Sequence, residues 1–242
     1  MSAPTSIAKK PVVKNASSGP AAEEEPILSA ERRASDIARP PRVGVNGILM
    51  GALGAMILIL MSFLSLPMPN VLAGLYVPPT TALSINYNFQ LPFAVFLGAF
   101  LGPTLGAGAV LGFILVGLLV LPVFAGGGGD LTYLLQPGFG FIVGMYIAAW
   151  MTGRMIRRVL KASSPKRVAT LFAVAFTAVL VTYATGAVYG VGLVLAHQLS
   201  WMALQNTLFH LAGEMAVYDI LATVMWLSLV RYARLLFWLI LY

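Results

Sequence analysis

The chain has 242 residues, of which 59% are hydrophobic and only 10% are charged, and its mean hydropathy is +0.88. Soluble domains carry roughly 45–50% apolar and about 25% charged residues, so this composition excludes an ordinary water-soluble enzyme and a disordered protein. The absence of cysteine excludes a disulfide framework and a thiolate nucleophile. What remains is a helical protein that crosses a membrane several times, with room for about five to seven spans of ~20 residues each.

Residues 1–42 differ from the rest of the chain. They are rich in Ala, Ser and Pro, contain the acidic run Glu23, Glu24 and Glu25, and show no apolar period. Such a stretch cannot bury enough surface to fold alone, and it lacks the apolar segment of a signal peptide. We therefore expect a disordered cytoplasmic tail over residues 1–42 and one transmembrane domain over residues 43–242.

The hydrophobic part of the sequence predicts six transmembrane helices, bounded by Gly, Pro or polar residues. In chain order they cover residues 43–66, 89–101, 104–121, 139–159, 167–196 and 214–231. We expect a proline-containing loop over residues 67–87 and an amphipathic interfacial helix between residues 198 and 213. The apolar residues 235–242 are too few to span, so we expect them in the interface or packed on the bundle.

The positions of the cations predict the orientation of the bundle. Seven of the 15 Lys and Arg residues precede the first predicted helix, six cluster within residues 154–167, and Arg231 and Arg234 come at the end. With six spans and the N-terminus inside, all of them lie on the cytoplasmic side, as the positive-inside rule requires, whereas five or seven spans break this agreement. We therefore interpret the net charge of +7 as an orientation device aided by anionic lipid, not as a nucleic-acid-binding surface.

Only three acidic residues follow the tail: Asp130, Glu214 and Asp219. The predicted topology places all three toward the outer face, with Asp219 about 7.5 Å deeper than Glu214 at 1.5 Å per residue. A carboxylate at depth costs at least about 2.5–3.5 kcal/mol and is a functional candidate by default, whereas Glu214 can equally serve the helix dipole. Because no Lys or Arg lies in the outer half, Asp219 must find neutral donors, stay protonated or meet the N–H groups of a ligand.

A glycine run precedes Asp130 and consists of Gly126, Gly127, Gly128 and Gly129. Glycines let the backbone approach a ligand closely and present its N–H and C=O groups, although a flexible external loop is the alternative. Aromatic and polar side chains near the outer face can wall a pocket or belong to the interfacial aromatic belt. These side chains are Tyr87, Asn88, Gln90, Tyr133, Phe139, Phe141, Tyr183 and Trp201.

Two further patterns carry alternative functions. His210 and Glu214 are four residues apart and can share a helix face, so that with Asp219 they suggest a metal-dependent intramembrane enzyme, although the carboxylates that usually orient metal-bound histidines are missing. Small residues recur at Gly47, Gly51 and Ala55 on the first predicted helix. Such a face permits close helix packing, either inside the bundle or against a separate membrane subunit.

Three stretches together resemble the BioY family of biotin-specific substrate-binding (S) components of energy-coupling-factor (ECF) transporters. They are Leu-Gly-Pro at 101–103, Leu-Pro-Val-Phe-Ala-Gly-Gly at 121–127, and Pro137 followed by Gly140, Phe141 and Gly144. The resemblance covers residues 44–234. It implies an all-α, six-helix membrane bundle of the S-component type with an outward-facing biotin site, capped by the loop after the first helix. It also implies a transmembrane (T) subunit and paired ATPase (A) subunits as partners.

By this resemblance, the glycine turn and Asp219 would contact biotin. A carboxylate can accept from the two ureido N–H groups, backbone N–H groups can meet the ureido carbonyl, and apolar walls can hold the rest of the ligand. The sequence departs from the family pattern where Ala222 stands in place of a frequent Lys, where Asp130 replaces a usual Gly, and where residues 70–85 lengthen the first loop. Either Tyr, Gln and backbone donors hold the ligand carboxylate, or the ligand differs from biotin.

We therefore expect a biotin-binding subunit of the cell membrane with both termini in the cytoplasm, no cofactor, and no nucleic-acid partner. The alternatives are an S component for another small vitamin-like ligand, the metal-dependent enzyme, and a structural or assembly protein without a ligand. The expected ligand-contacting residues are Asn88, Gln90, Gly126, Gly127, Gly128, Asp130, Tyr133, Phe141 and Asp219.

Overall fold

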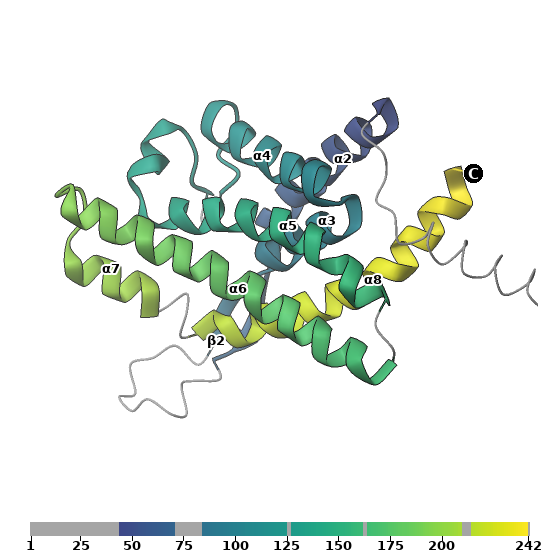
Figure 1. The fold of residues 1–242 in the computed structure, drawn as a ribbon. Coiled ribbons are helices and arrows are strands. Elements are labelled where there is room, and N and C mark those ends of the chain that lie inside the picture. The colour runs from purple at the N-terminus through teal and green to yellow at the C-terminus, as the bar shows by residue number, and fades with distance from the viewer. Residues whose placement is uncertain (1–43, 71–83, 125–126, 162–163, 210–213, 242) are drawn as a thin grey trace, which may run out of the picture. The chain divides into compact units, whose positions relative to one another are not determined.

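The computed structural model describes residues 44–70, 84–124, 127–161, 164–209 and 214–241 (Figure 1). All of them belong to the compact unit formed by residues 37–242, so the predicted tail lies outside the described residues. In chain order the elements are α2 (Val45–Phe63), β1 (Ser65–Pro69), β2 (Ser84–Asn88), α3 (Gln90–Leu101), α4 (Pro103–Leu119), the 3₁₀ helix η2 (Leu131–Leu135), α5 (Pro137–Lys161), α6 (Ser164–Leu195), α7 (Trp201–Leu208) and α8 (Ala216–Leu241). All six predicted helices are present, five of them with ends within three residues of expectation, and α7 is the predicted amphipathic helix.

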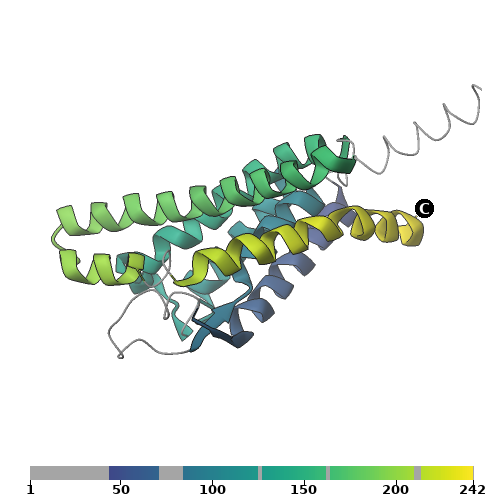
Figure 2. The same ribbon diagram turned by 90° about the horizontal axis from the view of Figure 1, so that it is seen from below.

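Helix α3 is the central helix of the bundle. Eleven of its 12 residues are buried, and it packs against α2, α4, α5 and α8. A helix that is apolar on all sides is typical of a position enclosed by other helices. Figure 2 shows the long helices α6 and α8 side by side, in agreement with the contacts between them.

Glycines let α3, α4 and α5 approach one another at backbone distance. A Cβ atom at Gly98 of α3 would lie 2.0 Å from the carbonyl oxygen of Ala149 in α5, and one at Gly153 would lie 2.5 Å from the nitrogen of Pro103 at the start of α4. No side chain fits at either position, because non-bonded carbon contacts are optimal near 3.5–4.0 Å. The end of α3, the beginning of α4 and the last turns of α5 therefore meet at one end of the bundle.

The expected loop over residues 67–87 was wrong at both of its ends. Residues Ser65–Pro69 and Ser84–Asn88 form an antiparallel pair in which Leu66 lies opposite Tyr87. The second strand shows the alternation of a half-buried strand, with Ile85 and Tyr87 buried between more exposed neighbours. The prolines of β1 suggested a loop, but proline is tolerated on an edge strand, and β1 pairs only with β2.

The predicted end of the last helix at residue 231 was also wrong. Helix α8 continues without a break to Leu241, and it includes residues 235–241, which we expected in the interface or packed on the bundle. No Gly or Pro follows Arg231 in the sequence, so nothing interrupts the helix, and the leucines of this stretch are good helix formers.

Four of the described helices are long and apolar enough to cross a membrane. They cover Val45–Phe63, Pro137–Leu160, Lys166–Leu195 and Ala216–Leu236. The apolar helices α3 and α4 are shorter, with 12 and 17 residues. By length and composition, the structure therefore supports a helical membrane protein with four candidate spans, and the number six stays a prediction.

Candidate functional site

The buried carboxylate of Asp219 is held by two tyrosines. Asp219 lies in the first turn of α8 and is 6% exposed. The Tyr87 hydroxyl donates to its Oδ1 atom at 2.9 Å, and the Tyr183 hydroxyl donates to Oδ2 at 2.5 Å. Of the three ways in which the sequence allowed this acid to be accommodated, the structure uses neutral donors. The N-terminal end of a helix adds a favourable potential for negative charge.

The two tyrosines reach Asp219 from different elements. Tyr87 lies on β2 and packs against Phe89 (5.1 Å between ring centroids) and Tyr218 (5.6 Å). Burial raises the pKa of the Tyr87 hydroxyl well above its ordinary value, and the nearby Asp219 raises it further, so this group stays protonated and acts as a donor. Tyr183 lies on α6 and makes an edge-to-face contact with Phe141 of α5 at 5.7 Å. The predicted residue Phe141 is thus joined to Asp219 through Tyr183.

Asn88 and Gln90 lie at the junction between β2 and α3. The Asn88 side chain donates to the carbonyl of Ser62 at 2.8 Å and accepts from the backbone N–H of Gln90 at 2.8 Å, so it fixes this junction. Gln90 is 7% exposed, and its Nε2 atom is buried with no hydrogen-bond partner among the described residues. A buried donor without a partner costs about 1–3 kcal/mol, which makes Gln90 the stronger ligand candidate of the two.

The glycine turn is built by backbone hydrogen bonds. The Phe124 N–H donates to the carbonyl of Gly128 at 2.8 Å, and the Gly127 N–H donates to the carbonyl of Phe124 at 3.0 Å. Gly127 has a φ of +74°, a conformation that glycine adopts without steric cost. Gly126, which the sequence placed in the same turn, lies outside the described residues.

Tyr133 supports this turn from inside the protein. It is 7% exposed and packs against Phe124 with 4.8 Å between ring centroids. A Cβ atom at Gly128 would lie 2.2 Å from the Tyr133 ring, so only glycine fits above the tyrosine. The predicted residues Gly128 and Tyr133 are therefore in contact, and Tyr133 shapes the turn.

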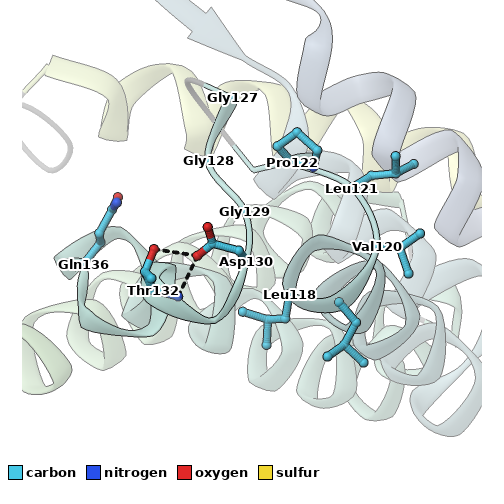
Figure 3. Close-up of a pocket in the computed structure, with 11 residues that line it drawn as sticks. Leu118, Val120, Leu121, Pro122, Gly127, Gly128, Gly129, Asp130, Thr132 and Gln136 are labelled. Carbon is cyan, nitrogen blue, oxygen red and sulfur yellow. Dashed lines mark hydrogen bonds between the residues drawn. The ribbon is translucent and has the colours of Figure 1, made fainter.

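Asp130 is the N-cap residue of η2 and lies at an open pocket beside the glycine turn. Its carboxylate accepts from the backbone N–H of Thr132 at 2.6 Å and from the Thr132 hydroxyl at 2.5 Å (Figure 3). These hydrogen bonds lower the pKa of Asp130. The pocket measures about 460 Å³ and is lined by residues 118–122, 127–130, 132 and 136.

The predicted site residues thus fall into two groups. Phe141 and Asp219 are linked by Tyr183, and Asn88 and Gln90 follow Tyr87 in the chain. The other group surrounds the glycine turn, and Asp219 is not among the residues that line its pocket. The sequence singled out both tyrosines as aromatic candidates, but nothing in the sequence pairs either of them with Asp219.

The residues of the alternative metal site are not assembled among the described residues. Glu214 accepts a hydrogen bond from the side-chain amide of Asn70 at 3.1 Å, whereas His210 lies outside the described residues. In the part of the chain that the structure describes, no three His, Cys, Asp or Glu residues lie close enough to hold a metal ion.

The small-residue stripe of α2 packs inside the bundle. Gly47 and Gly51 are buried, and a Cβ atom at Gly51 would lie 3.8 Å from the carbonyl oxygen of Leu105 in α4. Ala55 lies on the same side of α2, where its Cβ is 3.6 Å from the Cβ position at Gly112 of α4. Of the two uses that the sequence left open, the structure has the internal one. Docking of another subunit on this stripe stays a prediction.

Sequence reasoning missed the structural role of Arg234. This side chain is 4% exposed, and its guanidinium donates to the carbonyl of Phe100 at 3.2 Å and to that of Ala99 at 2.5 Å. Both carbonyls belong to the last turn of α3, where helical carbonyls lack partners. The sequence signal for this role was weak, because Arg234 looked like an orientation cation beyond the last span.

Comparisons with known proteins agree with this fold. A crystal structure of the S-component for biotin from an ECF-type ABC transporter superimposes with a TM-score of 0.56 at 21% identity, and covers 78% of this chain and 91% of that one. The chain therefore has the fold of that S-component.

Curated relatives carry similar names. A probable biotin transporter BioY from Lysinibacillus sphaericus is 43% identical over 75 residues, which are 31% of this chain and 38% of the relative. A second, from Pyrococcus horikoshii, is 38% identical over 28% of this chain and 43% of the relative. The chain therefore spans less than half the length of these two. The biotin transporter BioY from Rhizobium etli is 30% identical over 61% of this chain and 74% of the relative. The sequence model of the BioY family matches residues 37–237, and so the chain belongs to the BioY family.

Proposed function

We propose that this protein is a membrane-embedded substrate-binding subunit that takes up biotin. The observation that carries the proposal is the Asp219 carboxylate, which two neutral tyrosine hydroxyls hold at the N-terminal end of α8 in a bundle with the S-component fold. A carboxylate offers about four lone-pair sites. In the structure two of them accept from the tyrosines, and the group can accept a charge-assisted hydrogen bond from an N–H group of a ureido ring. The names of the relatives point to the same ligand.

The proposed topology has six membrane helices and both termini in the cytoplasm of a cell whose plasma membrane holds the protein. The distribution of charge supports it, because Arg154, Arg157 and Arg158 lie in the last turns of α5 and Arg234 contacts the end of α3. Asp219 lies at the opposite end of α8. The short α3 spans only about 18 Å at 1.5 Å per residue. Because α3 is enclosed by other helices, its length need not match the lipid.

The proposed partners are a T subunit and ATPase subunits of an ECF transporter, together with anionic lipid around the cytoplasmic cations. The sequence contains no Walker A motif, so energy for transport would come from a separate nucleotide-binding subunit. The chain itself makes and breaks no covalent bond in this scheme.

The proposed ligand contacts assign different groups to different parts of biotin. Asp219 accepts from a ureido N–H group, the backbone of the glycine turn at residues 126–128 meets polar groups of the ligand, and Phe141 and Tyr133 contribute apolar walls. Gln90 offers its buried donor, and Asn88 and Asp130 complete the proposed set. The ligand carboxylate meets neutral donors, because Ala222 provides no cation.

Titration of the purified full chain with biotin tests this function, with thiamine and riboflavin as control ligands. We expect saturable binding of biotin alone. The replacement Asp219→Asn should weaken binding about tenfold, because the hydrogen bonds lose their charge assistance and one of the two acceptor oxygens becomes an NH2 donor. The matched control Glu214→Gln removes another outer carboxylate and should leave affinity within twofold.

The possible outcomes separate the parts of the proposal. Equal biotin affinity in a folded Asp219→Asn variant would refute the role of Asp219. Binding of thiamine or riboflavin in place of biotin would identify an S component for another vitamin, the alternative that the missing cation at Ala222 favours. Absence of binding by the unmodified chain to all three would refute the proposed function.

A further inference from the structure

We propose that Tyr183 positions the Asp219 carboxylate for the ligand, whereas Tyr87 is a built-in substitute donor that the ligand displaces. This inference rests on the proposed function, because it concerns how an N–H donor of the ureido ring of biotin reaches Asp219. The two hydroxyls occupy different oxygens, Oδ1 for Tyr87 and Oδ2 for Tyr183. Since Asp219 is only 6% exposed, a ligand reaches the carboxylate only if one of the groups that cover it moves.

Tyr183 is held in a rigid seam between two long helices. A Cβ atom at Gly144 of α5 would lie 2.6 Å from the carbonyl oxygen of Thr182, and one at Gly186 of α6 would lie 2.7 Å from the Phe141 ring. The backbone of α6 thus touches α5 at Thr182, and the Phe141 ring of α5 lies on the α6 backbone at Gly186 and packs against Tyr183 at 5.7 Å. These contacts on both sides restrict the movement of Tyr183, which makes it the fixed donor.

Tyr87 is held by a much smaller element. It belongs to a two-stranded hairpin of two five-residue strands, and hairpins of this size are marginally stable on their own. The other strand has mostly exposed side chains. The Tyr87 side chain is only 1% exposed, so its hydroxyl leaves Asp219 when the hairpin shifts as a unit, a smaller rearrangement than a separation of two long helices.

The displacement frees the carboxylate for one N–H donor of a ureido ring. When Tyr87 leaves, Oδ1 is free and Oδ2 keeps the hydrogen bond from Tyr183. One ureido N–H can then donate to Oδ1 in a charge-assisted hydrogen bond, while the second N–H, which points to the other side of the ring, meets a different acceptor. Tyr183 fixes the orientation of the carboxylate for this contact.

The two tyrosines therefore predict opposite effects of the same substitution. The apparent affinity of a ligand is reduced by the fraction of protein in which its place is occupied, so Tyr87→Phe should bind biotin about tenfold more tightly, mainly through faster association. Tyr183→Phe should bind about tenfold more weakly, mainly through faster dissociation, because the carboxylate loses a charge-assisted hydrogen bond.

Two other tyrosines provide matched controls. The hydroxyl of Tyr189, also on α6, donates to the carbonyl of Leu134, so Tyr189→Phe tests the loss of a hydroxyl on this helix without touching Asp219. The hydroxyl of Tyr218 donates to the carbonyl of Pro69 at 2.5 Å, so Tyr218→Phe loosens the hairpin but leaves both oxygens of Asp219 occupied. We expect Tyr189→Phe to stay within twofold of the unmodified affinity. Tyr218→Phe should gain less than Tyr87→Phe, because Tyr87 is still present to occupy Oδ1.

The experiment measures equilibrium affinity and both rate constants for biotin on the purified full chain and each variant. In the Asp219→Asn background, Tyr183→Phe should change affinity less than twofold, an outcome that a merely structural role does not predict. If Tyr183→Phe fails to fold, it is replaced by Tyr183→His, which keeps a ring donor. The biotin affinity of Tyr183→His should fall between those of the unmodified chain and Asp219→Asn.

Three results would overturn the inference while the function stands. One is weaker binding in both Tyr87→Phe and Tyr183→Phe, which would make both tyrosines part of the bound site. Another is an equal gain in Tyr218→Phe, which would assign the effect to a loosened hairpin. The third is a Tyr183→Phe effect that persists in the Asp219→Asn background. If the unmodified chain binds no biotin, the proposed function fails and the inference fails with it.

Discussion

Replacing Arg234 with methionine should strongly destabilise the protein while leaving the surroundings of Asp219 intact. The guanidinium donates to two carbonyl groups in the last turn of α3, at 2.5 Å to Ala99 and 3.2 Å to Phe100. Hydrogen bonds to charged groups contribute about 1.5–3 kcal/mol each, with the longer bond at the low end. Methionine fills similar volume but leaves both carbonyls without this donor, so we expect a loss of about 3–5 kcal/mol, a large part of the 5–15 kcal/mol typical of a folded protein.

The unfolding of the purified chain in mixed detergent micelles, followed by circular dichroism, measures this loss. Arg234→Lys keeps the charge but lacks the fork of donors that serves two carbonyls at once, so its loss of stability should be about half of that of Arg234→Met. Arg231→Met is the matched control, because Arg231 is an exposed cation three residues earlier on the same helix, and its stability should change by less than about 0.5 kcal/mol. Equal stability of Arg234→Met and the unmodified chain would refute the idea that this arginine holds the end of α3.

Three further predictions test the packing of the bundle and the cap at Asp130. Gly98→Ala should prevent stable folding, because the new methyl group would lie 2.0 Å from a carbonyl oxygen of α5, whereas Gly108→Ala, which meets nothing within 4 Å, should preserve or raise thermal stability. Gly51→Leu should lower the thermal stability of the isolated chain, since a leucine overfills the contact between α2 and α4. If the melting temperature is unchanged but a T subunit no longer co-purifies, the stripe is a docking face instead. The stabilisation from the Asp130 cap is present above the ordinary pKa of an aspartate and is lost as pH falls through the depressed pKa of this group. In an NMR titration, Thr132→Val should return the pKa of Asp130 toward its ordinary value. An unchanged pKa in this variant would contradict the cap.

The sequence predicted the helices well because their signal is local. An apolar run between glycine and proline residues marks a membrane helix wherever it stands, and α3 ended at Leu101 as predicted. The hairpin was missed because its pairing joins residues about 20 positions apart, such as Leu66 and Tyr87. The end of α8 was missed because hydropathy measures how far a span extends in lipid, not how far the helix continues beyond it.

The candidate site shows the same division between local and tertiary information. Asp219 stood out because a buried acid in an apolar helix is costly, and Gly127 and Gly128 stood out by composition. The sequence did not indicate that Tyr87 and Tyr183 share that acid, because the three residues come from β2, α6 and α8. The stripe at Gly47 and Gly51 was equally suited to internal packing and to docking; the position of α4 shows the packing, and docking stays a prediction.

Composition and hydropathy alone determined that this is a helical membrane protein, where its helices lie, and which acid is exceptional, since all of these follow from the cost of placing polar groups in lipid. Only the tertiary structure decided which donors hold Asp219, that Arg234 holds the end of α3, and that the glycine turn rests on Tyr133. These contacts join residues far apart in the chain, and their existence depends on distances that the packing of the helices sets.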